Sequence, residues 1–379
     1  MTTTSKCPPF ANMRQDSNHY LEIFLNDIPL MDVRAPVEFN KGAFPCSTNL
    51  PILDDAQREA IGTRYKQAGQ DEAIALGLKL AIPEIRQQRL NAWIDFINNH
   101  PNGYLYCFRG GLRSRTAQTW LKDLGYRYPL IKGGYKAMRT FLLQEMANHI
   151  QHSHFIILAG MTGSGKTRVL KKMPHFIDLE GLANHKGSAF GRDLFDFQPS
   201  QINFENQLSI QLLKHQHFHS DTPLLIEDEG KFIGRITTPP DLYQRMLTLP
   251  RIFLERTTEE RIQIIREEYI DDNWPLYLKH FKNQAPQHFQ AFIMNNLERI
   301  KNRLGGLRYQ QVKASFEQAI RQLFDSGNSE MFNEGIGILL KEYYDPMYRY
   351  QLSKKTVDIS FSGKEAEILD WVNHYQASK

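Results

Sequence analysis

The sequence predicts an α/β protein with two parallel-sheet domains and a helical C-terminal extension. Its 379 residues exceed the usual size of a single hydrophobic core. Short apolar runs alternate with helix-like patterns in both halves of the chain, which is typical of parallel sheets. A glycine-rich loop follows an apolar run near residue 160 and indicates that a second sheet begins there.

The first domain is expected over residues 15–146. Its strands are predicted from short apolar runs, and its helices from apolar residues that recur every three or four positions. The predicted elements are a strand at 28–34, a helical insertion at about 54–90, a helix at 87–99, a strand at 103–108, a helix at 114–125, and a strand, glycine turn and helix at 128–142.

The second domain is expected over residues 152–260, after a short polar boundary at 147–153. Its predicted strands lie at 155–159, 175–180, 223–229 and 251–255. Beyond Thr257 the pattern is mostly helical, so we expect residues 261–379 to form a helical extension packed on the second domain.

Composition is that of an ordinary globular protein, with 41% hydrophobic and 23% charged residues. No apolar run approaches the ~20 residues that cross a bilayer, and the first residues lack the apolar core of a signal peptide. The three cysteines, Cys7, Cys46 and Cys107, are too few and too far apart for a disulfide framework. A cytoplasmic protein without membrane contact is therefore expected.

Positive charge is concentrated in one window of the chain. Residues 105–140 hold eight Lys or Arg residues and one acidic residue, a net charge of +7, whereas the whole chain carries +4. A local positive field of this kind attracts phosphates or nucleic acid. A solvated basic helix face is the alternative interpretation.

Cys107 ends an apolar strand and precedes a loop that contains Arg109, Gly110, Gly111 and Arg113. Loop amides, a helix N-terminus and two arginines favour an anion, so the pattern predicts a thiolate nucleophile. The paired glycines argue against a simple packing role because they permit close backbone approach. Cys107 and Arg113 also have the Cys-x5-Arg spacing of phosphate cradles, so the local pattern leaves sulfur, selenium and phosphate chemistry open.

The segment 160–167, GMTGSGKT, matches the phosphate-binding loop pattern G-x4-G-K-[ST] between a strand and a helix. Its amides surround a phosphate, the lysine reaches the outer oxygens and the threonine is placed to ligate Mg²⁺. The predicted phosphate- or diphosphate-binding residues are Gly160, Gly163, Ser164, Gly165, Lys166 and Thr167. The motif does not specify ATP.

Two further stretches near this P-loop carry candidate site residues. Glu227 or Asp228, at the end of a predicted strand, is a candidate to hold Mg²⁺ through water, with an ordinary acidic strand end as the alternative. His185, Lys186 and Ser188 lie in a glycine-containing stretch suited to substrate contacts, or to a plain surface turn.

Residues 31–51 resemble the N-terminal signature of rhodanese domains, and 130–137 resemble their C-terminal strand and glycine turn. The resemblance places Cys107 at the rhodanese nucleophile. It departs at Cys46, where a small glycine is usual, and in the insertion after Pro51; Cys46 is interpreted as a packing residue, with a second site thiol as the alternative. The matching residues are Asp32, Arg34, Pro36, Glu38, Phe39, Gly42, Pro45, Asn49 and Pro51.

A rhodanese-like half followed by a P-loop half resembles the bacterial tRNA 2-selenouridine synthase family over nearly the whole chain. The resemblance implies a selenotransferase and geranyltransferase acting on a 5-substituted 2-thiouridine at the tRNA wobble position. It implies geranylation of the sulfur from geranyl diphosphate, then replacement of S-geranyl by selenium from selenophosphate. The P-loop would hold the diphosphate, and Cys107 would carry selenium as a selenenylsulfide or assist its delivery, supported by Arg109 and Arg113.

The resemblance also implies the partners: the anticodon arm of a thiolated tRNA, and an enzyme that supplies selenophosphate. The basic window and the aromatic-basic stretch 342–355 are candidate tRNA contacts, although its tyrosines equally suit a helix core. We expect a monomer with no tightly bound cofactor, and Mg²⁺ as the one candidate ion. The alternatives are a P-loop kinase or plain sulfurtransferase with a rhodanese domain, and a non-catalytic tRNA-binding scaffold.

Overall fold

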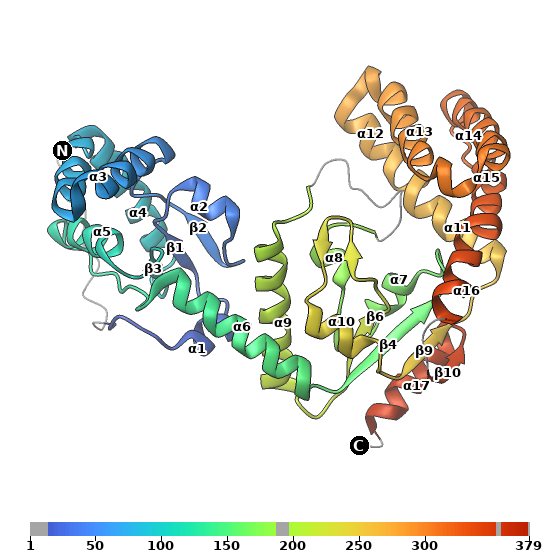
Figure 1. Cartoon of the computed structure of the whole chain (residues 1–379), viewed down its shortest axis with the longest axis horizontal. Helices are drawn as coiled ribbons and strands as arrows, with labels where there is room; N and C mark the ends of the chain where they lie inside the picture. Colours follow the sequence, from blue (N-terminus) through green and yellow to red (C-terminus); the bar gives the residue numbers. More distant parts are fainter. Residues whose placement is uncertain (1–13, 187–196, 354–357, 378–379) are drawn as a thin grey trace, which may run out of the picture. The chain divides into compact units, whose positions relative to one another are not determined.

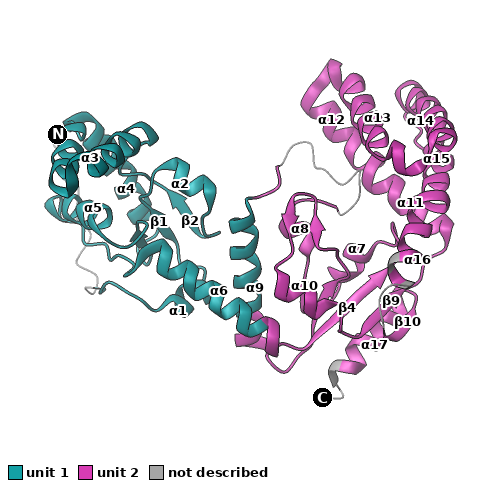
Figure 2. Ribbon diagram, in the orientation of Figure 1, with its two compact units in different colours: residues 1–149, 200–214 teal, residues 150–199, 215–379 magenta. Residues whose placement is uncertain are grey.

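The chain forms two compact units in a computed structural model that describes residues 14–186, 197–353 and 358–377. Unit 1 comprises residues 1–149 and 200–214, and unit 2 comprises residues 150–199 and 215–379 (Figure 2). Both units contain parallel sheets with helices around them, so the predicted α/β class and the helical C-terminal region are confirmed.

Unit 1 is built on a three-stranded parallel sheet in the order β2-β1-β3. The strands are β1 (Leu30–Asp32), β2 (Ser47–Asn49) and β3 (Tyr104–Tyr106). The strand expected near residue 130 is reduced to isolated parallel bridges, in which Leu130 pairs with Leu105 and Ile131 pairs with Ser17. Because the strands are parallel, β1 and β3 end at the same edge, and Cys107 follows β3 directly at that edge.

Helices pack around this sheet and bury its apolar side chains in two clusters. Trp93 from the helix after the insertion lies near Trp120, with ring centroids 5.9 Å apart. The helices of unit 1 are α1 (Tyr20–Leu25), α2 (Pro36–Lys41), α3 (Asp55–Leu80), α4 (Pro83–Asn99), α5 (Leu112–Asp123), most of α6 (Gly134–His152) and the first part of α9 (Gln201–His219).

A buried ion pair joins the sheet of unit 1 to the segment that follows it. The Arg34 guanidinium donates to the Asp32 carboxylate at 2.6 Å and to the Gly42 carbonyl at 2.8 Å, and both charged side chains are buried. The Asn49 amide donates to the main-chain carbonyls of Asp32 and Arg34. These contacts fix the loop between β1 and α2 against the sheet.

Unit 2 is built on a five-stranded parallel sheet in the order β10-β9-β4-β6-β5 (Figure 1). Its strands are β4 (Phe155–Gly160), β5 (Phe176–Ile177), β6 (Leu224–Glu227), β9 (Arg251–Leu254) and β10 (Ile359–Gly363). The sequence predicted the first four strands but placed residues 358–377 in a helical extension. Instead, β10 pairs with β9 and α17 (Glu365–Ala377) packs next to it, so this segment belongs to the sheet.

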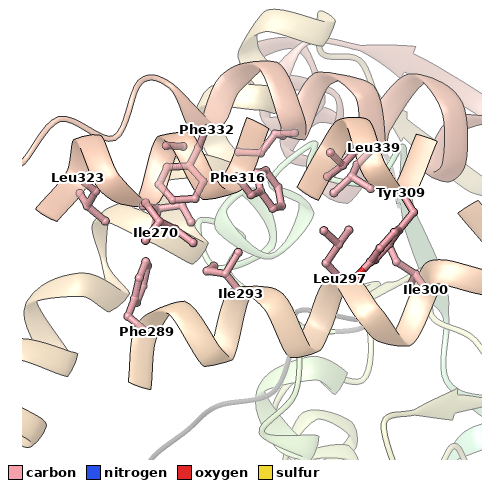
Figure 3. Packing of buried hydrophobic residues seen from close by; sticks show 14 of the residues in the cluster. Ile270, Phe289, Ile293, Leu297, Ile300, Tyr309, Phe316, Leu323, Phe332 and Leu339 are labelled. Carbon is pink, nitrogen blue, oxygen red and sulfur yellow. The ribbon is translucent and has the colours of Figure 1, made fainter. Parts of the chain in front are cut away.

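The helical part of unit 2 has its own hydrophobic core, part of which is drawn in Figure 3. Its elements are α11 (Thr258–Arg266), a π-helix at Glu267–Asp271, α12 (Asn273–Phe281), α13 (Ala285–Leu304), α14 (Gly306–Ser326), α15 (Phe332–Leu339), a π-helix at Leu340–Tyr344 and α16 (Asp345–Ser353). Around the sheet lie α7 (Lys166–Leu170), α8 (Leu179–Ala183), α10 (Pro240–Met246) and a hairpin of β7 (Phe232–Ile233) and β8 (Ile236–Thr237).

The division into units differs from the expected domains in two respects. Residues 200–214 of α9 pack in unit 1, where the Asn206 amide donates to the Ala43 carbonyl. The chain crosses from unit 1 to unit 2 between residues 149 and 150, within the predicted boundary at 147–153, but this segment is the end of helix α6 and not a linker. Among the described residues, no helix is long and apolar enough to cross a membrane.

We predict that the Asp32–Arg34 pair dominates the local stability of the unit 1 sheet. Arg34→Met should lower the free energy of opening of β1 and β3 by about 3–5 kcal/mol, because it leaves the Asp32 carboxylate buried without its partner. Hydrogen exchange measured by mass spectrometry on peptides that cover both strands checks this. Arg64→Met breaks the exposed Arg64–Glu72 pair and should cost under about 1 kcal/mol. Equal effects from both variants would contradict the assignment.

Candidate functional site

The phosphate-binding loop lies between β4 and α7, as the sequence predicted. Gly163 and Gly165 have φ angles of 77° and 73°, which a residue with a side chain rarely adopts. A Cβ on Gly163 would also lie 2.4 Å from the Cδ1 atom of Ile265. The loop therefore needs glycine at 163 for its backbone conformation and for its close contact with α11.

Lys166 and Thr167 begin helix α7 at the end of this loop. The Lys166 ammonium donates to the Gly160 carbonyl across the loop at 3.3 Å. Ser164 is buried, and its hydroxyl makes no hydrogen bond to any described residue. The loop thus brings an ammonium, a hydroxyl and the N-terminus of α7 to one place, which suits an anion.

The Thr167 hydroxyl lies next to two carboxylates. Its Oγ1 is 3.0 Å from Glu227 Oε2 and 3.4 Å from Glu180 Oε2. Glu227 is fully buried at the end of β6 and accepts a hydrogen bond from the Glu180 amide. Burial, and then the neighbouring charge of Glu180, raise the pKa of Glu227 well above its usual range. Glu227, rather than Asp228, is therefore the acid that contacts the P-loop threonine.

Asp228 and Glu229 follow at the same end of β6. Asp228 lies 3.6 Å from the buried Arg251 guanidinium, with which it forms an ion pair. Burial, and then the charge of Glu180, raise the pKa of Glu229 to about 8, while the Lys166 ammonium acts in the opposite direction. In the part of the chain that the structure describes, no group of three or more metal-binding side chains is found.

A cavity of about 370 Å³ connects the P-loop to the interior of the helical region. One end is polar and is lined by residues 162–167 together with Glu180, Asp228 and Glu229. The other end is apolar. Its lining residues from the helical region include Ile265, Ile270, Ile293, Phe316, Ile336, Leu339, Leu340 and Met347. Figure 3 shows Ile293, Phe316 and Leu339 directed into the space between the helices.

The other sequence candidates of unit 2 have different positions. Lys186 lines this cavity, donates to the Glu268 carbonyl at 3.2 Å and lies over the Tyr269 ring. His185 is half-buried and is not among the residues that line the cavity. Ser188 lies outside the described residues.

The tyrosines of the aromatic-basic stretch 342–355 have three kinds of surroundings. Tyr343 and Tyr344 belong to the hydrophobic core of the helical region. Tyr348 lines the cavity, and Tyr350 is exposed. The core interpretation therefore holds for the first two, and Tyr350 is left as a candidate for stacking on a base.

In unit 1, Cys107 lies at the end of β3 where two glycine turns meet. A Cβ on Gly134 would lie 2.3 Å from the Cys107 carbonyl oxygen and 2.6 Å from the Gly110 amide nitrogen. Gly110 has a φ angle of 64°, and its own Cβ would lie 2.9 Å from backbone atoms of Ile131 and Gly133. These contacts explain Gly110 and Gly134, because backbone packs against backbone around the cysteine, whereas a Cβ on Gly111 would meet nothing within 4 Å.

The cysteine side chain is buried, and its polar neighbours differ from those predicted. The Ser114 hydroxyl donates to the Cys107 sulfur at 2.9 Å, a contact that the sequence analysis did not identify. Arg113 forms a two-pronged ion pair with Glu38, at 2.5 and 3.2 Å, and this pair lowers the pKa of Glu38 against the effect of burial. Arg109 is exposed in the loop. Arg113 therefore already has a carboxylate partner.

Cys46 is half-buried and packs against one of the two apolar clusters of unit 1. Burial, and then the nearby charge of Asp27, raise the pKa of its thiol to about 11. A thiol of this kind is protonated at neutral pH, which supports the packing interpretation over a second reactive thiol.

The fold and the site of unit 2 define a class: an α/β P-loop protein whose phosphate loop opens into an apolar cavity. Comparison with known proteins narrows the class. A model of the tRNA 2-selenouridine synthase AAA domain matches residues 153–379. A tRNA 2-selenouridine synthase of Marinobacter nauticus is 47% identical over 94% of this chain and 97% of its own length.

Two further relatives give the same result. The tRNA 2-selenouridine synthase of Alcanivorax borkumensis is 47% identical over 95% of this chain and 99% of its own length. That of Shewanella sediminis is 44% identical over 94% of this chain and 97% of its own length. The chain therefore belongs to the tRNA 2-selenouridine synthase family, and the resemblance read from its motifs is confirmed.

Several residues around the site were not predicted from the sequence. Glu180 follows a two-residue strand and carries no motif. The apolar wall of the cavity comes from helices whose periodic residues look like ordinary core. Neither Glu180 nor the apolar lining residues have a local sequence pattern that marks them as site residues. They come close to the P-loop only in the folded structure.

We predict that Cys46 reacts with iodoacetamide slowly at neutral pH. Because its pKa is raised to about 11, the thiolate is present at only about one part in a thousand at pH 8. The alkylation rate should rise about tenfold per pH unit from pH 7 to 10. Mass-spectrometric peptide mapping over this range checks it, and a rate that levels off near pH 8 would contradict the assignment.

Proposed function

We propose that this chain converts a 5-substituted 2-thiouridine at the wobble position of tRNA to 2-selenouridine in two steps. The sulfur is first geranylated from geranyl diphosphate, and S-geranyl is then replaced by selenium from selenophosphate. The names of the relatives support the overall reaction. The observation that carries the first step is the cavity with a phosphate loop at one end and aliphatic side chains at the other.

Geranyl diphosphate matches both ends of this cavity. Its diphosphate suits the amides of residues 163–167 and the Lys166 ammonium, and its ten-carbon chain suits the apolar end near Ile293 and Leu339. A purine base would place its polar ring nitrogens among the mainly apolar side chains of this end, which costs free energy. The volume of about 370 Å³ lies in the range of small-molecule sites.

In the first step the thiocarbonyl sulfur attacks C1 of the geranyl group. The bond from C1 to oxygen breaks, its electron pair leaves with diphosphate, and the N3 proton of the base passes to solvent. Lys166 and the loop amides stabilise the charge that develops on the leaving oxygen. Thr167 and Glu227, which contact each other, would hold a Mg²⁺ ion together with the diphosphate. That ion would supply further neutralisation of the leaving group.

For the second step we propose that unit 1 acts as a rhodanese-like domain with Cys107 as its nucleophile. Selenium in selenophosphate has the oxidation level of selenide, so a selenenylsulfide on Cys107 would require an added oxidant. Displacement at phosphorus requires none, so we favour assisted delivery. The Cys107 thiolate attacks phosphorus, the P–Se bond breaks, and hydroselenide is released. Water then cleaves the S–P bond, which returns phosphate and the thiol.

Hydroselenide attacks C2 of the S-geranyl base, the C2–S bond breaks, and geranyl thiol leaves after taking up a proton. Alkylation makes the displacement at C2 possible. The alkylated sulfur can leave as a neutral thiol, whereas an unmodified thiocarbonyl sulfur is a poor leaving group. The hydrogen bond from Ser114 to the Cys107 sulfur would stabilise the thiolate. Arg109, exposed in the same loop, is the arginine placed for an incoming anion.

The basic window 105–140 supports tRNA as the substrate. Six of its eight basic side chains are exposed, whereas Arg113 and Arg139 form ion pairs with Glu38 and Glu205. Exposed lysines and arginines that contact phosphates make RNA binding weaken steeply with salt. Those six are Arg109, Arg115, Lys122, Arg127, Lys132 and Lys136.

Two variants should separate the two steps. Lys166→Ala should lower the rate of S-geranylation roughly 100-fold, because it removes the ammonium that stabilises the leaving diphosphate. Cys107→Ala should keep geranylation and accumulate S-geranyl-2-thiouridine in place of 2-selenouridine. Mass analysis of nucleosides from thiolated tRNA, incubated with geranyl diphosphate and then selenophosphate, measures both products.

Lys313→Ala, which removes a half-exposed lysine paired with Glu317 on α14, is the matched control and should behave as wild type. Normal geranylation by Lys166→Ala would overturn the role of the P-loop. Normal selenation by Cys107→Ala would overturn the role of the cysteine.

A further inference from the structure

Unit 1 contains a second and larger cavity, of about 870 Å³, that the steps above leave without a role. On one side it is lined by helix α3, the insertion after Pro51 that departs from the rhodanese pattern. On the other side it is lined by Arg109 of the Cys107 loop and by Leu112 and Arg113 at the start of α5. The cavity therefore lies between the insertion and the loop that carries the proposed nucleophile.

The insertion forms two helical arms that fold back on each other. Gly69 has φ 85° and ψ −173°, which interrupts α3 near its middle. Across this turn Arg64 forms an ion pair with Glu72. Farther along, a Cβ on Gly77 would lie 3.5 Å from Ile61 Cδ1. The two arms thus run antiparallel and together present one wall to the cavity.

This wall is mixed, and several of its large apolar side chains are incompletely covered. Tyr65 and Leu78 on α3 are 56% and 62% exposed, and Leu112 at the start of α5 is 53% exposed, yet all three line the same cavity. Along its 26 residues α3 buries only Gln57 and Ala73. Large apolar side chains gathered around one cavity indicate a binding surface for an apolar group.

The same cavity has polar groups suited to an anionic or acceptor-rich ligand. Arg89 lines it, and its Nη1 atom is buried without a hydrogen-bond acceptor among the described residues. A buried donor left unpaired is costly, so an acceptor from a ligand would be favoured there. Arg58 and Lys66 of α3 also line the cavity, together with Arg109. The cavity has two carboxylates as well, Glu59 and Glu38, and Glu38 is already paired with Arg113.

We propose that this cavity binds the S-geranylated wobble nucleotide for the selenation step. The geranyl chain lies along the apolar wall near Tyr65 and Leu78, and the uracil and phosphate oxygens face the arginines. This inference rests on the proposed function and deepens it, because it gives the S-alkylated nucleotide a site distinct from the P-loop cavity. The S-geranylated nucleotide combines an apolar chain with an anionic backbone, and the lining offers apolar and basic side chains that complement them. Binding here would bring C2 of the base to the loop where selenium is released.

Binding of synthetic anticodon stem-loops to the full-length chain tests the proposal. The stem-loops carry S-geranyl-2-thiouridine, S-methyl-2-thiouridine or 2-thiouridine. Wild type should bind the S-geranyl form at least about tenfold more tightly than the S-methyl form. Leu78→Glu should remove most of this preference and lower selenation of the pre-geranylated stem-loop about tenfold. Because Leu78 is largely exposed, the variant should fold, and wild-type hydrogen exchange of the peptides that cover β1 and β3 reports whether unit 1 has.

Leu21→Glu is the matched control, because Leu21 on α1 is 40% exposed in unit 1 and does not line the cavity. An unchanged preference in Leu78→Glu, or equal affinity of wild type for the S-geranyl and S-methyl forms, would overturn the proposal. Failure of the proposed function gives a different result: wild type would then form no S-geranyl nucleoside from geranyl diphosphate, whatever the stem-loop affinities. Equal losses in Leu78→Glu and Leu21→Glu would also count against a specific site.

Discussion

The contact between the P-loop and the helical region depends on Arg261, and the composition of the unit 2 cavity follows from it. The buried Arg261 guanidinium donates to the Thr162 carbonyl at 2.9 Å and forms an ion pair with both oxygens of Asp345. One side chain of α11 therefore joins the phosphate loop to the first residue of α16. Gly163 allows Ile265 of the same helix to approach the loop closely. As a result, the phosphate end and the apolar end belong to one cavity.

A second constraint governs unit 1. The Asp32–Arg34 pair and the Asn49 amide hold the segment after β1. Gly110, Gly133 and Gly134 let two turns approach each other closely around Cys107. Glu38 at the start of α2 pairs with Arg113 at the start of α5. The residues that matched the rhodanese signature thus mostly position the loop, and the chemistry that we propose for unit 1 involves Cys107, Ser114 and Arg109.

The sequence predicted those features that have a local signal. Apolar runs located β1, β3, β4, β6 and β9, and the glycine motifs located both loops. Strand β10 was missed because it is mostly exposed, partly polar and more than a hundred residues from its partner β9. The pairing of Arg113 with Glu38, across 75 residues, has no sequence signal either. Cavity-lining residues such as Ile293 and Leu339 have the same periodicity as core residues, so only the fold reveals them.

In the function that we propose, the unit 2 cavity holds both the diphosphate and the geranyl chain of one substrate. The most direct measurement compares binding of geranyl diphosphate and inorganic diphosphate by calorimetry in wild type and in Met347→Trp. Met347 is half-buried and lines the cavity, so the larger indole should occupy space needed by the chain. We expect Met347→Trp to bind geranyl diphosphate at least about tenfold more weakly than wild type and inorganic diphosphate with unchanged affinity. Met331 lies outside the cavity, so Met331→Trp should change neither affinity. Unchanged affinity for geranyl diphosphate, or an equal loss for both ligands, would contradict it.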